Sequence, residues 1–574
     1  MRNDHYSLPP RLWSRVSAVL DDWERSGKVA RLWAGDPSLW TGRDEKSWLG
    51  WLNIAQEQLL HLEPLVDFSE EVRRSKYFRH TLLLGMGGSS LFPEVLARSF
   101  GSSEQFPQML VLDSTVPAQV KAFEETIDFD HTLFIVSSKS GTTLEPNIFM
   151  RYFLQRTRET VGAAEAPHRF IAITDPGSQL HRISEAEGFR HIFFGVPTIG
   201  GRYSALSNFG MVPAATMGLD LRQLLSRAEE MAQSCSENVA AKENPGVLLG
   251  AVLGALGKEG RDKVTLIASP GLRGLGGWLE QLLAESTGKN GMGLIPVDGE
   301  KPAAPESYGE DRVFVYLRLD SAPDAEQERA VEALSKADQP VVTLALRDTF
   351  DIGSEVFRWE MATAVAGAVL RINPFDQPDV EASKIATREL TQQFEKKGAL
   401  PQEPPLYEVD GIQLFADPNL AGILPSGGPG RLAGILKTHL DRSMVGDYFA
   451  LIAYLPMNEA IERRLQSIRH LVRDVRHLST CLGFGPRFLH STGQAYKGGP
   501  NEGVFIQITS DDPIDLPVPG QKYSFGVVKT AQARGDFRVL VERGRRALHV
   551  HLGRNLEADL TTFERAMAEA LKCE

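Results

Sequence analysis

From about residue 80 onward, short apolar runs alternate with segments of helical length, and this alternation decides the fold class. The first runs cover residues 81–84, 109–112, 133–136 and 170–173; a second set covers 264–268, 313–317 and 341–346. Such alternation is typical of βαβ units, in which parallel strands are joined by right-handed crossovers. The sequence therefore predicts an α/β protein with parallel sheets flanked by helices.

The chain is too long for one ordinary core. Its 574 residues predict three or four domains, or two large α/β ones. Residues 1–75 have helical periodicity and carry tryptophans that we expect to pack against a larger body. We place the first α/β domain at 76–240, the second at 241–400, and a further α/β segment at 401–574. In that segment, 448–454 is expected to be a strand, 458–477 a helix and 556–571 a closing helix.

Composition excludes several classes of protein. The chain is 42% apolar and 24% charged, as in a soluble globular protein, and it has neither an apolar leader at residues 1–10 nor a membrane-length apolar run. Its three cysteines lack metal-ligand spacing, which predicts free thiols in a reducing cytoplasm. A net charge of −12 argues against a nucleic-acid partner. Any anionic ligand must therefore be held by local cations.

A hydroxyl-rich turn at residues 137–145 lies where a predicted strand is followed by a helix. Backbone N–H groups at a helix N-terminus are unpaired and carry partial positive charge, so they suit a phosphate. The turn adds four hydroxyl donors, one cation and one small residue: Ser138, Ser140, Thr142 and Thr143, then Lys139, then Gly141. The alternative is a polar loop whose hydroxyls cap their own helix.

Two glycine-rich turns are further candidates. Residues 85–90, which include Gly88 and Ser89, follow the first predicted strand, where small residues let the backbone approach a ligand. They lack the full dinucleotide-binding fingerprint. Residues 199–204 place Arg202 next to Gly201, and a guanidinium suits an oxyanion or a phosphate. The alternative for this second motif is an arginine in a surface turn.

Three later segments bring together groups suited to acid-base chemistry. Gln281 and Glu285 are four residues apart, so on a helix they share one face; the alternative is a charge on a solvated face. Gln377 lies at the start of a predicted helix, and Lys384 lies about two turns further along much the same face. His490 occupies a loop and can titrate near neutral pH. We interpret His549 and His551 as structural, because no metal-ligand spacing surrounds them.

Together these segments resemble the phosphoglucose isomerase family. The resemblance rests on the motifs GMGGSS, SSKSGTTLEPN, GGRYS, WLEQLLAESTGK, NPFDQPDVEASK and LHSTGQ, which extend from about residue 80 to residue 500. It implies two sugar-isomerase domains, at 76–240 and 241–400, each a parallel sheet flanked by helices. It also implies that the rearranged C-terminal segment 401–574 completes the second domain and carries the catalytic histidine.

The resemblance implies an aldose-ketose isomerase that interconverts glucose 6-phosphate and fructose 6-phosphate through a cis-enediolate, without metal or cofactor. Glu285 would move the proton, Arg202 would stabilise the enediolate, and His490 would open the sugar ring. Lys384 is the fourth catalytic candidate and, like Gln377, would face the ligand. The candidate substrate-binding residues are Gly88, Ser89, Ser138, Lys139, Ser140, Thr142, Thr143, Gly201, Gln281 and Gln377.

The motif order departs from most of the family, because His490 follows Lys384 instead of preceding it. This order resembles the isomerase half of fused transaldolase/glucose-6-phosphate isomerase proteins. A transaldolase barrel needs about 250 residues, and only 84 precede Gly85, so we expect the isomerase alone. The family contributes its ring-opening histidine across a two-fold interface, so a homodimer is expected, with His490 from either chain. The alternatives are a non-catalytic sugar-phosphate sensor and an isomerase that also accepts mannose 6-phosphate.

Overall fold

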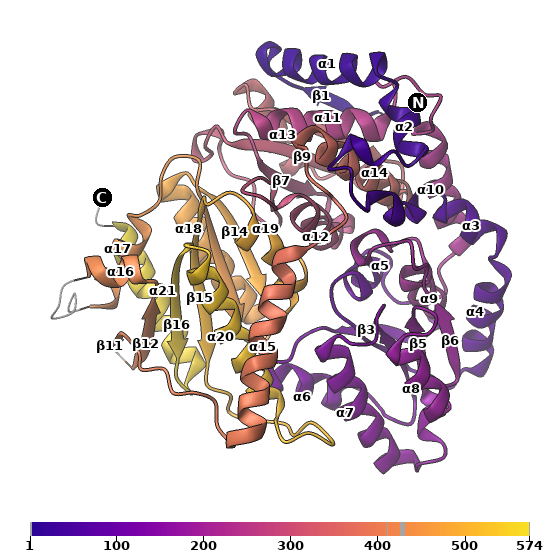
Figure 1. Ribbon diagram of the computed structural model, residues 1–574, viewed down its shortest axis with the longest axis vertical. Coiled ribbons are helices and arrows are strands. Elements are labelled where there is room, and N and C mark those ends of the chain that lie inside the picture. The colour runs from indigo at the N-terminus through magenta and orange to yellow at the C-terminus, as the bar shows by residue number, and fades with distance from the viewer. Residues whose placement is uncertain (1–2, 410, 425–430, 573–574) are drawn as a thin grey trace.

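The structure is a computed structural model that describes residues 3–409, 411–424 and 431–572. It contains three sheets, and apart from the N-terminal strand β1 each is built from a separate stretch of the chain (Figure 1). The predicted α/β class with parallel sheets flanked by helices is confirmed.

The first sheet is entirely parallel, and both of its faces are buried. Its strands lie in the order β3 (Gln108–Leu112), β2 (His80–Leu84), β4 (Thr132–Ser137), β5 (Phe170–Thr174) and β6 (His191–Phe194). Its helices are α5 (Leu91–Phe100), α6 (Pro117–Thr126), α7 (Leu144–Val161), α8 (Gln179–Glu187) and α9 (Asn208–Thr216). Burial on both faces explains why its strands are continuous apolar runs in the sequence.

The second sheet is parallel except at one edge. Its order is β1 (His5–Ser7), β10 (Val341–Leu346), β9 (Arg312–Leu319), β7 (Lys263–Ala268) and β8 (Ile295–Val297). The helices around it are α10 (Leu221–Ser234), α11 (Pro245–Lys258), α12 (Leu275–Thr287), α13 (Ala325–Lys336) and α14 (Ile352–Leu370). Strand β1 pairs antiparallel with β10, so the N-terminal segment, expected to be helical, also contributes a strand.

The rest of that N-terminal segment is helical, as predicted. It forms α1 (Pro10–Arg25), α2 (Lys28–Trp33), α3 (Ile54–Leu60) and α4 (Glu63–Ser75). Trp23 and Trp51 are buried in the large core that these helices share with the first two sheets. Trp13, in contrast, is partly exposed.

The C-terminal segment forms a third sheet of its own. The order is β11 (Tyr407–Val409), β12 (Ile412–Ala416), β16 (Arg546–Leu552), β15 (Gly503–Ser510), β13 (Tyr448–Tyr454) and β14 (Ser479–Phe484). Its helices are α15 (Pro378–Lys397), α16 (Pro418–Ile423), α17 (Leu432–Leu440), α18 (Glu459–Arg476), α19 (Gly493–Gly498), α20 (Phe525–Glu542) and α21 (Leu556–Lys572). Strands β13 to β16 are parallel, and β12 runs antiparallel to β16.

This third sheet corrects the expectation that residues 401–574 complete the second domain. None of its strands pairs with the second sheet. One of its faces packs against α17, α18 and α21, and the other packs against residues of α19, α20 and β8. The third sheet is therefore separate in its strand pairing, while β8 of the second sheet helps to cover one of its faces.

Helix α20 docks the third sheet's domain onto the first. Phe525 stacks on Phe149 of α7 at 6.1 Å between ring centroids, and it meets Tyr152 edge-on at 5.5 Å. Helix α15 packs along α20 near the centre of Figure 1. The two domains therefore meet where α7 begins.

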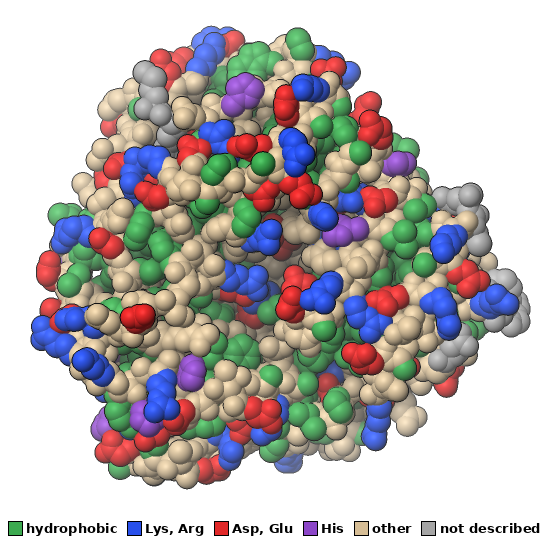
Figure 2. Space-filling view, turned by 180° about the vertical axis from the view of Figure 1, so that it is seen from behind, with side chains coloured by type: hydrophobic (Ala, Val, Ile, Leu, Met, Phe, Trp, Pro, Cys, Tyr) green, Lys and Arg blue, Asp and Glu red, His purple; other side chains and the backbone are tan. Residues whose placement is uncertain are grey.

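Charges are mixed on the surface. On the face shown in Figure 2, acidic and basic side chains are interspersed around a central hollow. Within the described ranges, no helix is both long enough and apolar enough to cross a bilayer.

Candidate active site

The predicted site residues converge on one cleft with a volume of about 470 Å³. All candidates except Thr142 line it, and they come from all three sheet domains of a single chain. His490, whose place in the order of motifs differs from most of the family, is among them. The cleft also receives Asp175, Ser178 and Pro146, which sequence reasoning did not select.

The hydroxyl-rich turn connects β4 to α7, as predicted. Gly141 has a φ of +69°, and a Cβ atom there would lie 2.2 Å from the backbone nitrogen of Leu180. The Ser138 hydroxyl accepts the Gly141 N–H at 3.2 Å, whereas Thr143 occupies the N-cap position and its side chain does not cap the helix. The turn therefore presents hydroxyls and helix N–H groups to the cleft.

Two members of the turn differ from their predicted roles. The Lys139 ammonium lies 2.7 Å from an Asp175 carboxylate oxygen and donates to two backbone carbonyls, so its charge is already paired. Thr142 lies outside the cleft, and its hydroxyl bonds to that of Ser140 at 2.8 Å. A run of six residues shows neither the Lys139–Asp175 ion pair nor the direction in which the Thr142 side chain points.

The two glycine-rich turns touch each other. The first contains a 3-10 turn at Gly87–Ser89 and the second one at Gly201–Tyr203. A Cβ atom on Gly88 would lie 2.0 Å from the Gly201 carbonyl oxygen. Only glycine permits this backbone approach, and it brings Arg202 to the cleft.

Glu285 and Arg202 form the centre of the site. Glu285 Oε1 lies 3.3 Å from an Arg202 guanidinium nitrogen, and Glu285 Oε2 accepts a hydrogen bond from Gln281 at 3.1 Å. The guanidinium, 2% exposed, also donates to Ser286 Oγ, Gln377 Oε1 and the carbonyls of Pro374 and Asp376. The predicted shared face of Gln281 and Glu285 on α12 is confirmed.

His490 reaches this centre from the third sheet's domain. Its backbone carbonyl accepts from Gln281 Nε2 at 2.8 Å, so one amide contacts both His490 and Glu285. Its ring Nε2 lies 3.1 Å from Oε1 of Glu145. Lys384, on α15, is partly exposed at the same cleft and lies 3.3 Å from Glu381.

Glu145 is a candidate functional residue that sequence reasoning missed. It belongs to the first turn of α7 and is buried. Burial alone raises the pKa of a carboxyl, but the charge and hydrogen bond of His490, together with Lys384, hold the pKa of Glu145 below its usual value. Its partner lies 345 positions away, so no local pattern could show the pair.

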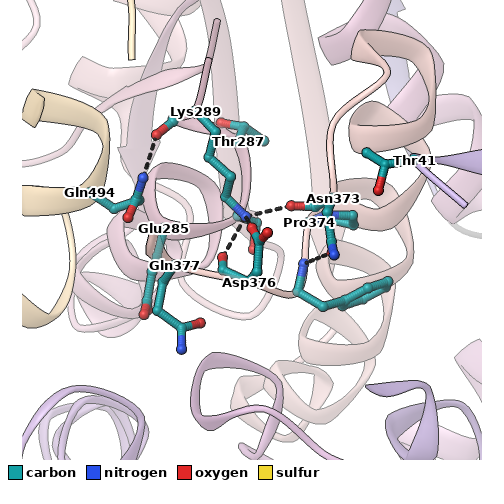
Figure 3. A network of polar contacts seen from close by, with 12 residues as sticks. Thr41, Glu285, Thr287, Lys289, Asn373, Pro374, Asp376, Gln377 and Gln494 are labelled. Carbon is teal, nitrogen blue, oxygen red and sulfur yellow. Dashed lines mark hydrogen bonds and ion pairs between the residues drawn. The ribbon is translucent and has the colours of Figure 1, made fainter. Parts of the chain in front are cut away.

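Lys289 was also missed, although its motif was recognised. Figure 3 shows its ammonium among the carbonyl of Asn373 and two oxygens of Asp376, beside Glu285 and Gln377. Burial and the nearby Arg202 lower the pKa of Lys289 to about 7. This lysine fixes the segment that precedes α15, which places Gln377 against Arg202.

Comparison with known proteins agrees with this architecture. The sequence model of the family Phosphoglucose isomerase matches residues 60–310. The probable glucose-6-phosphate isomerase of Methanococcus maripaludis is 28% identical over 379 residues, which cover 59% of this chain and 83% of that protein. The glucose-6-phosphate isomerase of Carboxydothermus hydrogenoformans is 28% identical over 414 residues, covering 62% and 88%.

Two solved structures share the fold. A hypothetical protein from Thermus thermophilus has a TM-score of 0.57 and 26% identity, covering 67% of this chain and 99% of that one. A glucose-6-phosphate isomerase from Chlamydia trachomatis has a TM-score of 0.52 and 22% identity, covering 60% and 74%. The family's sequence model includes Ser138, Arg202 and Glu285, whereas Lys384 and His490 lie beyond it. From its motifs, its sheets and these relatives, the resemblance to the phosphoglucose isomerase family is confirmed, and the family's sequence model covers residues 60–310 of the chain.

Proposed function

We propose that this enzyme interconverts glucose 6-phosphate and fructose 6-phosphate. The observation that carries the proposal is the pairing of the Glu285 carboxylate with the Arg202 guanidinium in a cleft that also contains the hydroxyl-rich turn. A carboxylate beside a fixed cation suits a proton transfer that generates an oxyanion. The turn suits the phosphate of the same substrate.

In this mechanism one carboxylate performs both proton steps. Glu285 takes the proton from C2 of the open-chain aldose, and the electron pair forms a C1–C2 double bond while negative charge develops on the C1 oxygen. The proton then returns to C1, and the hydroxyl proton moves from O2 to O1. Such positioned acid-base catalysis contributes about a hundred- to ten-thousandfold. Arg202 stabilises the oxyanion without moving, because its other nitrogens are already hydrogen-bonded.

Ring opening precedes this step, and His490 with Glu145 is suited to it. The ring opens when a proton leaves the anomeric hydroxyl and another reaches the ring oxygen. An imidazole can both accept and donate a proton near neutral pH. The contact between His490 and Glu145 supports this role. A homodimer and a cytoplasmic location stay predictions, as does any relation to a transaldolase.

A coupled assay tests the proposal. Purified protein is given fructose 6-phosphate, and the glucose 6-phosphate formed is oxidised by an added dehydrogenase that reduces NADP. We expect turnover that EDTA does not change and that Glu285→Gln abolishes. Binding of sugar phosphates without turnover would instead identify a sensor. Equal turnover of mannose 6-phosphate would identify the broader isomerase.

A further inference from the structure

The Glu145 carboxylate is held by two side chains of the third sheet's domain. Its Oε1 atom lies 3.1 Å from His490 Nε2 and accepts a second hydrogen bond from Gln532 Nε2 at 2.6 Å. Gln532 lies on α20 and is 2% exposed. No sequence motif drew attention to it. Gln532 is therefore a buried hydrogen-bond donor, and Glu145 alone lies between it and the ring of His490.

The orientation of the Gln532 amide is fixed at both ends. A carboxylate can only accept hydrogen bonds, so the NH₂ group must face Glu145. The amide oxygen then accepts from the Thr115 hydroxyl at 2.7 Å, and Thr115 is fully buried. The hydrogen bonds thus run from Thr115 through Gln532 and Glu145 to His490. This series links the segment between β3 and α6 to α20, α7 and the loop that carries His490.

The hydrogen bond donated by Gln532 favours the ionised form of Glu145, which can only accept a hydrogen bond from His490. A buried carboxylate remains ionised when it accepts hydrogen bonds, and an ionised Glu145 is an obligate acceptor toward Nε2. A neutral imidazole that donates from Nε2 keeps Nδ1 as its acceptor. In the part of the chain that the structure describes, Nδ1 of His490 makes no hydrogen bond. That nitrogen is the one available to a substrate hydroxyl.

We propose that Gln532 is a positioning residue for ring opening. It holds Glu145 in the ionised, acceptor-only form, and Glu145 in turn fixes the tautomer and orientation of His490. The inference rests on the proposed function. It gives helix α20, which lies outside the residues matched by the family's sequence model, a role in positioning His490. The stacking of Phe525 on Phe149 holds α20 against α7 and so maintains the contact.

The decisive variant is Gln532→Leu, which keeps the side-chain size and removes the donor. Two substrates separate ring opening from proton transfer: fructose 6-phosphate, which is mostly cyclic, and 5-deoxyfructose 6-phosphate, which lacks the hydroxyl that closes the ring. We expect kcat for fructose 6-phosphate to fall about tenfold or more, as for a lost hydrogen bond to a charged group, with KM unchanged. Solvent proton exchange with the open-chain substrate should stay near the wild-type rate.

A second variant, Gln532→Glu, adds a signature in pH. The new carboxyl would lie against Glu145, where like charges cannot both ionise. The other titratable groups near Glu145 are His490, Lys384 and Tyr454. At lower pH the new carboxyl holds a proton and donates it as the amide did. The ratio of variant to wild-type rate should therefore rise as the pH falls.

Controls separate this proposal from a folding defect. Gln507 is a second buried glutamine of the same domain, bonded to Ala533 and Asp536 away from the cleft. Gln507→Leu should leave the ratio between the two substrates unchanged. If Gln532→Leu fails to fold, Thr115→Val is the deciding variant. Its kcat for fructose 6-phosphate should fall by a smaller factor, and its proton exchange with the open-chain substrate should stay near the wild-type rate. Equal losses on both substrates, or no loss, would overturn the inference. An inactive wild-type protein would instead overturn the proposed function.

Discussion

The Arg202 guanidinium is buried and extensively hydrogen-bonded, and it contacts the Glu285 carboxylate. Five acceptors surround the guanidinium, and one of them is the Glu285 carboxylate at 3.3 Å. A cation held in this way needs no rearrangement when negative charge develops nearby.

We therefore expect Glu285→Gln to bind a phosphorylated sugar acid as the wild type does, and to lose exchange of the substrate's C2 proton with solvent. The amide has the same shape but cannot accept the proton. The loss should reach about a hundred- to ten-thousandfold. NMR in deuterated solvent measures the exchange, and calorimetry measures binding. Exchange at the wild-type rate would remove Glu285 from the mechanism.

The phosphate turn gives a second prediction at this scale. Ser138→Ala combined with Thr143→Ala should weaken sugar-phosphate binding, since each lost hydrogen bond to a charged group costs about 1.5 to 3 kcal/mol. The matching unphosphorylated sugar is the internal control. If both ligands lose affinity equally, the turn does not hold the phosphate.

Residues within one motif could be selected from the sequence, and residues joined across motifs could not. Spacing alone placed Gln281 and Glu285 on one face, because helical periodicity is local. Glu145 and His490 meet across 345 positions, and Lys139 finds its counterion in another loop. Such contacts depend on how whole elements pack, which no short window of sequence contains.

At the scale of elements, the contact between the two glycine-rich turns makes a sharp prediction. Gly88→Ala would put a Cβ atom 2.0 Å from the Gly201 carbonyl, so the turns must separate and carry Arg202 away from Glu285. Such overpacking costs about 1 to 3 kcal/mol of stability, and activity should fall by more than that stability loss explains.

The matched control is Gly200→Ala, in the same turn. A Cβ atom there meets nothing within 4 Å, so activity and melting temperature should stay close to those of the wild type. Steady-state kinetics and thermal unfolding of both variants make the comparison. A fully active Gly88→Ala protein would show that the turns do not position Arg202.

Elements with a strong local signal were predicted well. The run at 448–454 coincides with β13, and the expected helix at 458–477 closely matches α18. Strand β1 escaped notice because three polar or aromatic residues at a sheet edge have no apolar pattern. The sequence did not show that residues 401–574 form a sheet of their own, because an apolar run contains no information about which strand it pairs with.

At the scale of the molecule, the four candidate catalytic residues line one cleft of a single chain. His490 and Glu285 both contact Gln281 of the same chain. We expect no activity to reappear when the separately purified Glu285→Gln and His490→Ala proteins are mixed, because neither chain can repair the other's cleft. Restored activity would show that the working sites are shared between chains.

Buried histidines make stability depend on pH. His439 is fully buried and His549 nearly so, and burial lowers the pKa of each to about 3. In the unfolded chain each titrates near 6.5, so unfolding takes up protons below that value. The contribution of each histidine to stability is fully present above pH 6.5 and is lost as the pH falls toward 3.

Between pH 6.5 and 5 each histidine should therefore reduce the free energy of unfolding by about 2 kcal/mol. Urea unfolding at a series of pH values measures this slope. His439→Gln keeps a donor for the Phe505 carbonyl, and its free energy of unfolding should fall by about 2 kcal/mol less than that of the wild type between pH 6.5 and 5. The same pH dependence in His439→Gln as in the wild type would contradict the assignment of His439.

The series from Thr115 to His490 also sets an order in time. A ribosome that has just made Glu285 must still add the residues up to Gln532, which takes roughly 12 to 50 s at the usual speed of elongation. During that interval the strands of the first sheet are complete and those of the second sheet are finished at β10, but His490 and Gln532, which hold Glu145, are still missing. Under the proposed mechanism, a nascent chain therefore carries Glu285 long before it contains the groups proposed for ring opening, and the proposed site is complete only once α20 has been made.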